Sequence, residues 1–475
     1  MSADDMKAAR DGAEQRMSRE DKEEWWEGDP RSEFEHDRDR ILYSSAFRRL
    51  AGVAQVAAVR EKHLLHNRLT HSLKVAQLGR RMAERLLKID EDRGRAGEER
   101  KFENEEWLPE VTEAAGLAHD LGHPPFGHIA EEVLHRHMQN FGSGFEGNAQ
   151  SFRIVVNLAS RKEGVPGLNL TRATRNAILK YPRFMTDPPE SGKIRVWHNR
   201  KYGEKWGAYD TEYDAFSDAR LGFHDEKTRM RCAAAILMDW ADDVSYATHD
   251  LADYFRAGLI PLDAIRDEFR IKDDSGTKKW RRKAFMDFSF ERLGRNPGFS
   301  KDAYETNYNA LGGERGELGV VEHEWMDRRQ DRLDLVHLIN ALIRKFASAA
   351  ELASDPPYVQ IAPSAQYQVE ILKQFAWFYV IKHPALSLTQ EGQKRIIDAL
   401  FSKLVTLLGD ARNQVPAHLS DIYEQSGEVR DDLRRARAVC DYICFLTEDQ
   451  ALDLYEKVTG LSVSRGSIFG AWFGK

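Results

Sequence analysis

The sequence predicts a mainly α-helical protein, and two observations support that prediction. In most of the chain apolar residues recur every three to four positions, which is the period of an amphipathic helix. The alternation of apolar and polar residues that marks a strand is confined to short stretches such as IRVWHN (194–199). We therefore expect helices along the whole chain and few strands.

Four segments before residue 260 show the helical period most clearly. They are RILYSSAFRRLAGVAQV (40–56), HSLKVAQLGRRMAERLLK (71–88), LPEVTEAAGLAHDL (108–121) and RCAAAILMDWADDVSYATHDLADYF (231–255). Gly122 and the pair Pro124–Pro125 end the third of these helices, because proline cannot continue a helix. The less regular stretches 186–225 and 272–318 are expected to form loops.

These patterns divide the chain into four parts. Residues 1–25 are polar and expected to be disordered, and residues 26–260 form a helical core. Residues 261–320 are expected to be an irregular insertion or linker. From residue 321 to 475 amphipathic runs predict a C-terminal helical region that packs on the core.

The composition limits the class of protein. With 475 residues, 41% of them hydrophobic, the chain can bury a large core. A formal net charge of -7 argues against general coating of nucleic acid, which depends on neutralising phosphates. Neither a signal peptide nor an apolar run of roughly 18 residues is present, so we expect a cytoplasmic protein with no membrane partner. The cysteines Cys232, Cys440 and Cys444 form no CxxC pair and are expected to be reduced.

The stretch LAHDLGHPPFGH (117–128) combines three histidines and an aspartate directly after a helix. Imidazoles and carboxylates hold divalent ions without thiolates. His119 and Asp120 are neighbours that point about 100° apart on a helix, so other helices must supply further ligands. His71, which opens one helix, and Asp242, inside another, are the candidates.

Around Asp242 the spacing of polar residues suggests the wall of a pocket. Asp242, Tyr246 and Asp250 are four positions apart and therefore lie on one helix face. Two carboxylates and a phenol are costly to bury without partners in an otherwise apolar helix. A solvated helix face would also explain these three residues taken alone.

Seven sequence blocks together resemble one family. The chain is similar to deoxynucleoside triphosphate triphosphohydrolases of the dGTPase type, which belong to the HD-domain superfamily of metal-dependent phosphohydrolases. The blocks are DRDRILYSSAFRRLAGVAQV (37–56), NRLTHSLKVAQ (67–77), AHDLGHPPFGHIAEE (118–132), FEGNAQSFRI (145–154), ILKYPRF (178–184), ADDVSYATHDLAD (241–253) and DYICFLT (441–447). Phe445 and Leu446 stand where the family usually has Gly-Met, and residues 272–318 match nothing in it.

The resemblance implies an HD-type catalytic core at 26–260 with an additional C-terminal helical region. It implies hydrolysis of deoxynucleoside triphosphates, dGTP being the first candidate, to a deoxynucleoside and inorganic triphosphate. The cofactor would be Mn²⁺ or Mg²⁺, or another divalent transition metal. The metal ligands that the resemblance assigns are the four residues His71, His119, Asp120 and Asp242.

A second helix can begin after the proline pair, near Gly127. It would place His128 and Glu131 on one face, three residues apart, as a pair suited to proton transfer. In the family the matching residues are the catalytic pair, and the residue matching His123 lies near the phosphates. His135 and His137, further along the same helix, are expected to be surface residues.

A triphosphate requires basic residues that converge on it. Arg68 resembles the phosphate-contacting arginine of the family, and Lys180 is a second candidate. Gln55 and Asp250 resemble the pair that bonds the 3′-hydroxyl of the sugar. Tyr246 resembles the ring that packs under the sugar and excludes ribonucleotides by collision.

Two other functions stay open. Another HD-type hydrolase, acting on a nucleoside monophosphate or a cyclic dinucleotide, would hold two metals with His123 and His128 as added ligands. A nucleotide-responsive or single-stranded-DNA-responsive regulator would use the site as a sensor. KKWRRK (278–283) and the three phenylalanines in the next seven residues mix basic and aromatic groups as single-strand binders do, although a charged loop explains them as well. The resemblance also suggests a homo-oligomer, hexameric in some members.

Overall fold

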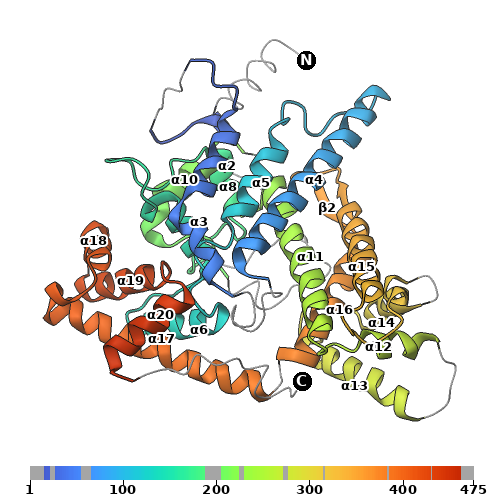
Figure 1. Cartoon of the computed structure of the whole chain (residues 1–475). Helices are drawn as coiled ribbons and strands as arrows, with labels where there is room; N and C mark the ends of the chain where they lie inside the picture. Colours follow the sequence, from blue (N-terminus) through green and yellow to red (C-terminus); the bar gives the residue numbers. More distant parts are fainter. Residues whose placement is uncertain are drawn as a thin grey trace. The chain divides into compact units, whose positions relative to one another are not determined.

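The computed structural model confirms that the protein is mainly α-helical (Figure 1). The structure describes residues 15–21, 27–54, 66–187, 205–223, 229–270, 276–313, 316–381, 384–428 and 430–461. In these residues the strands are β1 (Ala350–Leu352) and β2 (Val359–Ile361), which pair antiparallel. Gln55 and the segment 194–199 lie outside the described residues. None of the described helices is both long and apolar enough for a transmembrane span.

The chain folds into two compact units. As far as they are described, Met1–Asp187, Lys205–Met238 and Leu388–Lys475 form the first unit, and Asp239–Ser387 belongs to the second. This division differs from the four parts expected from the sequence. The described residues of 388–461 share a unit with the N-terminal core, because side chains far apart in the sequence pair and pack there.

The first unit is built around α4 and α5, which lie side by side (Figure 1). Their close approach depends on Gly116, where a Cβ atom would come within 2.7 Å of the Ala76 Cα atom. The helical elements of this unit before residue 239 are α2 (Glu33–Tyr43), α3 (Ser45–Arg49), η1 (Leu50–Gly52), α4 (Arg68–Arg95), α5 (Leu108–Ala118), α6 (His128–Gln139), α7 (Gly147–Arg153), η3 (Ile154–Leu158), α8 (Arg172–Ile178), η4 (Asp210–Glu212), α10 (Tyr213–Arg220) and the start of α11 (Ala233–Arg256).

The helix expected at 40–56 is two helices, α2 and α3, separated at Ser44. The Ser44 side chain accepts a hydrogen bond from the Phe47 N–H and so caps α3. Most of 1–25, expected to be disordered, lies outside the described residues. Within it, the Arg19 side chain bonds Asp37 and the carbonyl oxygen of Asn169, so residues 15–21 contact the core.

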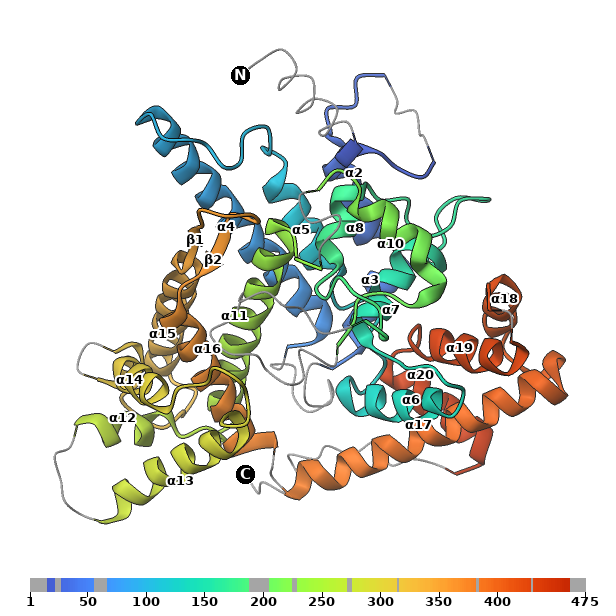
Figure 2. The ribbon, with the colours of Figure 1, turned by 180° about the vertical axis from the view of Figure 1, so that it is seen from behind.

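The C-terminal helices of the first unit pack on α6 (Figure 2). Ala130, Val133 and Leu134 of α6 share an apolar core with Ile397 and Leu400. A buried ion pair joins Arg153 Nη2 to the Asp441 carboxylate at 2.9 Å. The elements of this region are α17 (Pro384–Asp410), η7 (Arg412–Gln414), α18 (Ala417–Gln425), α19 (Asp431–Ile443) and α20 (Glu448–Thr459).

The cysteines behave as small apolar side chains, as expected. All three are free thiols, and Cys440 and Cys444 are buried in the core beside α6. Burial raises the pKa of the Cys440 thiol to about 12.

Residues 261–320, expected to be irregular, contain three α-helices and a short 3-10 helix of the second unit in the part that the structure describes. The reason is an aromatic core that the basic residues around it concealed in the sequence: Phe285 is buried, and its ring stacks on Phe375 with 4.7 Å between centroids. Since Phe285 lies in this core, it is not available to stack on a nucleic-acid base. The elements of this unit are α12 (Leu262–Arg270), α13 (Gly276–Leu293), α14 (Lys301–Gly312), η5 (Glu317–Val320), α15 (Arg329–Ser348), β1, β2, α16 (Pro363–Ala376) and η6 (Trp377–Ile381).

Candidate functional site

The first group of the site comes from the N-terminal turn of α4. Asn67 caps this helix by accepting a hydrogen bond from the Thr70 N–H at 2.9 Å. The cap places Arg68 and His71 in the first turn, where their exposed fractions are 3% and 1%. The His71 ring lies 5.5 Å from the ring of His119, measured between centroids.

His119 and Asp120 follow directly after α5. His119 Nδ1 lies 2.7 Å from the carbonyl oxygen of Gly116, which makes Nδ1 the donor and leaves the Nε2 lone pair as the ligand atom. His119 Nε2 is 3.4 Å from Asp120 Oδ1. A histidine held in this way by a carbonyl is typical of metal ligands. We refer to His71, His119 and Asp120 as the metal corner.

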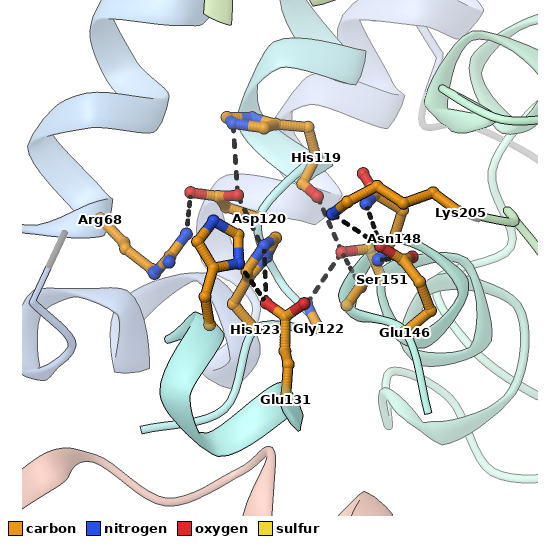
Figure 3. A network of polar contacts seen from close by, with 12 residues as sticks. Arg68, His119, Asp120, Gly122, His123, Glu131, Glu146, Asn148, Ser151 and Lys205 are labelled. Atoms are coloured by element: carbon orange, nitrogen blue, oxygen red, sulfur yellow. Dashed lines mark hydrogen bonds and ion pairs between the residues drawn. The ribbon is translucent and has the colours of Figure 1, made fainter. Parts of the chain in front are cut away.

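The Asp120 carboxylate is shared between a guanidinium and imidazoles (Figure 3). Arg68 Nη1 donates to Asp120 Oδ2 at 2.7 Å, and His123 Nδ1 lies 3.1 Å from Asp120 Oδ1. Burial alone would raise the pKa of Asp120, but the charges of Arg68 and the neighbouring histidines hold it well below its usual value. The group is therefore a carboxylate, as a metal ligand must be.

The turn between the two histidine groups depends on its glycines. Phe126 and Gly127 have φ angles of 67° and 56°, in the left-handed region, before α6 begins at His128. A Cβ atom on Gly127 would lie 2.9 Å from Arg68 Nη2, and one on Gly122 only 2.1 Å from the Ser151 backbone nitrogen. The glycines in HDLGHPPFGH thus allow the chain to pass close to Arg68 and α7.

His128 and Glu131 form a second group, which we refer to as the acid–base corner. His128 Nδ1 is 3.0 Å from Glu131 Oε1, and the His128 side chain is 69% exposed whereas that of Glu131 is 12% exposed. Burial alone would raise the pKa of Glu131, but His128 and His123 hold it well below its usual value. The structure therefore places an exposed imidazole against a half-buried carboxylate on one helix face, and the role of the pair in proton transfer stays a prediction.

His123 lies between the two corners. Its Nε2 atom is 3.3 Å from Glu131 Oε1, and its ring centroid is 5.7 Å from that of His128. Burial and the positive charge of Arg68 lower the pKa of His123 to about 3, so the ring is neutral near neutral pH. His123, His128 and Glu131 each offer an atom within 4.8 Å of the others and could also hold an ion.

Two charged residues beside the acid–base corner, Glu146 and Lys205, were not among the predicted site residues, although Glu146 lies in the block 145–154. Lys205 Nζ donates to Glu146 Oε1 at 3.0 Å, and Glu146 caps α7 by accepting from the Asn148 N–H at 2.6 Å (Figure 3). Burial alone would lower the pKa of Lys205, but the Glu146 carboxylate keeps it above its usual value. No periodic pattern marks Lys205, and only its place in the fold reveals it.

The remaining predicted residues are distributed over both units. Lys180 is buried in the first unit, after α8. Asp242, Tyr246 and Asp250 lie on α11 in the second unit, the first two half-buried and Asp250 buried. Burial and the nearby Asp253 carboxylate raise the pKa of Asp250 well above its usual value. Asp250 therefore does not belong to a solvated helix face.

His135 and His137 were expected at the surface, and the structure corrects this. His135 is half-buried and accepts a hydrogen bond from the Phe145 N–H at 3.2 Å. His137 stacks on Phe401 with 4.3 Å between centroids and lies 2.8 Å from an Asp398 oxygen. Both are drawn inward because α6 packs between α17 and the loop that precedes α7.

Similar proteins are known for nearly the whole chain. Residues 68–247 match the family model of the HD domain, and residues 359–457 match that of the phosphohydrolase-associated domain. A deoxyguanosinetriphosphate triphosphohydrolase-like protein of Corynebacterium efficiens is 32% identical over 448 residues, which cover 92% of this chain and 93% of the relative. Proteins of the same name from Streptomyces coelicolor and Brucella suis are each 30% identical over 90% of this chain and over 93% and 89% of their own lengths. The HD-domain fold expected from the sequence is thereby confirmed.

Proposed function

The chain belongs to the family of deoxyguanosinetriphosphate triphosphohydrolase-like proteins, which are HD-domain phosphohydrolases, and we propose that it hydrolyses deoxynucleoside triphosphates at the α-phosphorus. The products would be a deoxynucleoside and inorganic triphosphate, and dGTP is the first candidate substrate. The observation that carries this proposal is that the buried metal corner lies next to the His128–Glu131 pair. His123 contacts both Asp120 and Glu131 and so connects the two groups.

A divalent ion, Mn²⁺ or Mg²⁺, fits the donor set of the metal corner. His71 and His119 offer imidazole nitrogens, Asp120 offers a carboxylate oxygen, and the Gly116 carbonyl orients His119 as in known metal sites. We assign Asp242 of α11 as the fourth ligand. When bound, the ion would supply Lewis-acid polarisation of a phosphate oxygen.

His128 is the proton-transfer group of the proposed reaction. Glu131 accepts the Nδ1–H of the imidazole, which fixes the ring and leaves Nε2 as the atom that gives or takes a proton at the scissile ester. The carboxylate stays ionised because its pKa is held low, so it also stabilises a protonated ring. The high exposure of His128 gives a substrate access to this nitrogen.

The substrate contacts that we propose are those that the family resemblance implies. Arg68 and Lys180 would face the phosphates, with His123 as a neutral hydrogen-bonding partner beside them. Lys205 adds a cation close to Glu131. We assign Gln55 and Asp250 to the 3′-hydroxyl of the sugar, and Tyr246 to its 2′ face.

The product assay tests the function directly. The purified protein is incubated with Mn²⁺ or Mg²⁺ and each of the four deoxynucleoside triphosphates, singly and pooled, and the products are resolved by anion exchange. Formation of intact triphosphate and a deoxynucleoside would support the proposal. The rates measured with the four substrates would give the base preference. Pyrophosphate or orthophosphate would show another reaction on the same fold, and turnover only in the pool would indicate activation by a nucleotide.

Replacing Tyr246 tests the assignment of the sugar site. Tyr246→Ala removes the ring that we expect to collide with a 2′-hydroxyl, so the variant should gain ribonucleotide turnover by about tenfold or more relative to deoxynucleotide turnover. Tyr254→Phe, on the same helix, is the matched control because Tyr254 is fully buried. An unchanged ratio in Tyr246→Ala would count against the assignment.

A second candidate function has one observation in its favour. His123, His128 and Glu131 lie close enough to hold a second ion, which would suit an HD-type hydrolase of monophosphates or cyclic dinucleotides. Metal analysis of the purified protein distinguishes the two, since one ion per chain fits the triphosphohydrolase and two fit the alternative. The homo-oligomer, and binding of single-stranded DNA, stay predictions for light scattering and for titration with an oligonucleotide.

A further inference from the structure

The turn that joins the two corners is bonded to the C-terminal helices of the same unit. Arg49 is buried, and its guanidinium donates to three backbone carbonyl oxygens. Nη2 reaches His123 at 2.7 Å, Nη1 reaches Leu121 at 3.3 Å, and Nε reaches Leu446 at 2.7 Å. The start of the catalytic turn and the segment before α20 are therefore held by one side chain.

Glu448 is a second residue of the C-terminal helices that lies close to this turn. It is the first residue of α20, and its side chain turns back into the core, where the residue is 7% exposed. Glu448 Oε1 accepts a hydrogen bond from the Ala54 N–H at 3.0 Å, and the Phe126 N–H is close enough to the carboxylate to lower its pKa. Phe126 is the first of the two left-handed residues before His128, and Ala54 is the residue before Gln55.

A carboxylate in this place does not serve the stability of the fold. Burial raises the pKa of Glu448 to about 7, which means that the buried charge disfavours folding near neutral pH and above. A neutral side chain of the same size would avoid this cost, although an amide would turn its N–H₂ group toward a backbone donor. The two backbone N–H groups that it holds belong instead to segments that carry predicted site residues.

We propose that Glu448 is a positioning residue, whose carboxylate fixes the Phe126–Gly127 turn and the chain at Ala54 so that His128 is held in place for proton transfer. The inference rests on the proposed function, because it assigns Glu448 a part in that reaction. A left-handed turn leaves His128 at the end of a strained segment, and a displacement of about 1 Å at a reacting group costs up to about 100-fold in rate.

Variants of Glu448 test the proposal against a purely structural role. Glu448→Gln keeps the shape but turns an amide N–H₂ toward one of the two donors, and Glu448→Ala removes both acceptors. Both should lower kcat by about 10- to 100-fold with little change in KM. The control is Asp449→Asn, an exposed carboxylate next in the chain, which should leave kcat unchanged.

Thermal unfolding separates positioning from stability. A folded pKa of about 7, above the usual value of 4.5, means that the wild-type fold loses stability as pH rises from about 4.5 to 7. At pH 8 the Tm of Glu448→Gln should therefore equal or exceed that of the wild type, although its kcat is lower. A Tm that falls together with kcat in Glu448→Gln would assign a structural role instead and overturn the proposal.

Hydrogen exchange supplies a readout that does not depend on catalysis. Backbone exchange in a peptide containing Phe126 should be faster in both Glu448 variants than in the wild type and in Asp449→Asn. If the wild type hydrolyses no deoxynucleotide, the proposed function fails, and this comparison still decides whether Glu448 holds the turn. A kcat within about twofold of the wild type, or unchanged exchange at Phe126, would overturn the positioning role.

Discussion

Asp120 of the metal corner and His128 of the acid–base corner are close in the sequence, yet the two corners differ in how far their side chains are exposed. His71, His119 and Asp120 are 1% to 4% exposed, whereas the His128 side chain is 69% exposed. The metal corner lies where α4 and α5 pack closely, and His128 is the first residue of α6, after a left-handed turn. The comparison teaches that the proposed ligands are held by the core of the fold, while the proposed proton-transfer group is held by a turn and one carboxylate.

The largest effect is expected in the metal corner. His119→Ala removes a ligand from a buried site, so bound metal should be lost and kcat/KM should fall by more than about 1,000-fold. Metal analysis by mass spectrometry and the product assay measure the two effects. A variant that keeps a full complement of metal and most of its activity would remove His119 from the site.

His128 provides the sharpest contrast with His119. Because His128 transfers a proton and binds no ion in the proposed mechanism, His128→Ala should lower kcat by about 100- to 10,000-fold without loss of metal. The same two measurements apply. Loss of metal from this variant would abolish the difference between the corners and favour the two-metal hydrolase.

Gly127 links the two corners, and its replacement should affect both stability and activity. Gly127→Ala combines a φ of 56° with a Cβ atom 2.9 Å from Arg68 Nη2, which should cost about 1–3 kcal/mol of folding free energy and lower activity. Gly142→Ala is the matched control, since Gly142 has a φ of 74° but no neighbour within 4 Å. Chemical denaturation measures both, and equal costs would show that the contact with Arg68 is unimportant.

The smallest effect is expected at His137, on α6 but outside both corners. His137→Gln removes a ring that stacks on Phe401 and should cost less than about 1 kcal/mol of stability. Metal content and kcat should stay within about twofold of the wild type. A large loss of activity would mean that the packing of α6 on α17, rather than the turn before α6, controls the position of His128.

The sequence by itself determined the elements whose information is local. The period of the apolar residues predicted helices at α4, α5 and α11, and the Gly and Pro residues after α5 predicted the turn before His128. The pairing of His128 with Glu131 followed from a spacing of three on one helix. Such features depend on neighbours within a few residues, so they are visible without a structure.

Only the tertiary structure decided the contacts between distant residues. Arg68 pairs with Asp120, and Lys205, which bonds Glu146, lies close to Glu131. Glu448 bonds the Ala54 N–H and lies close to the Phe126 N–H. The same limit explains α13, where basic residues concealed an aromatic face that only its partner helices reveal. The pKa and the stability of a buried charged group depend on residues far away in the sequence. No local sequence pattern shows which of these residues will contact it.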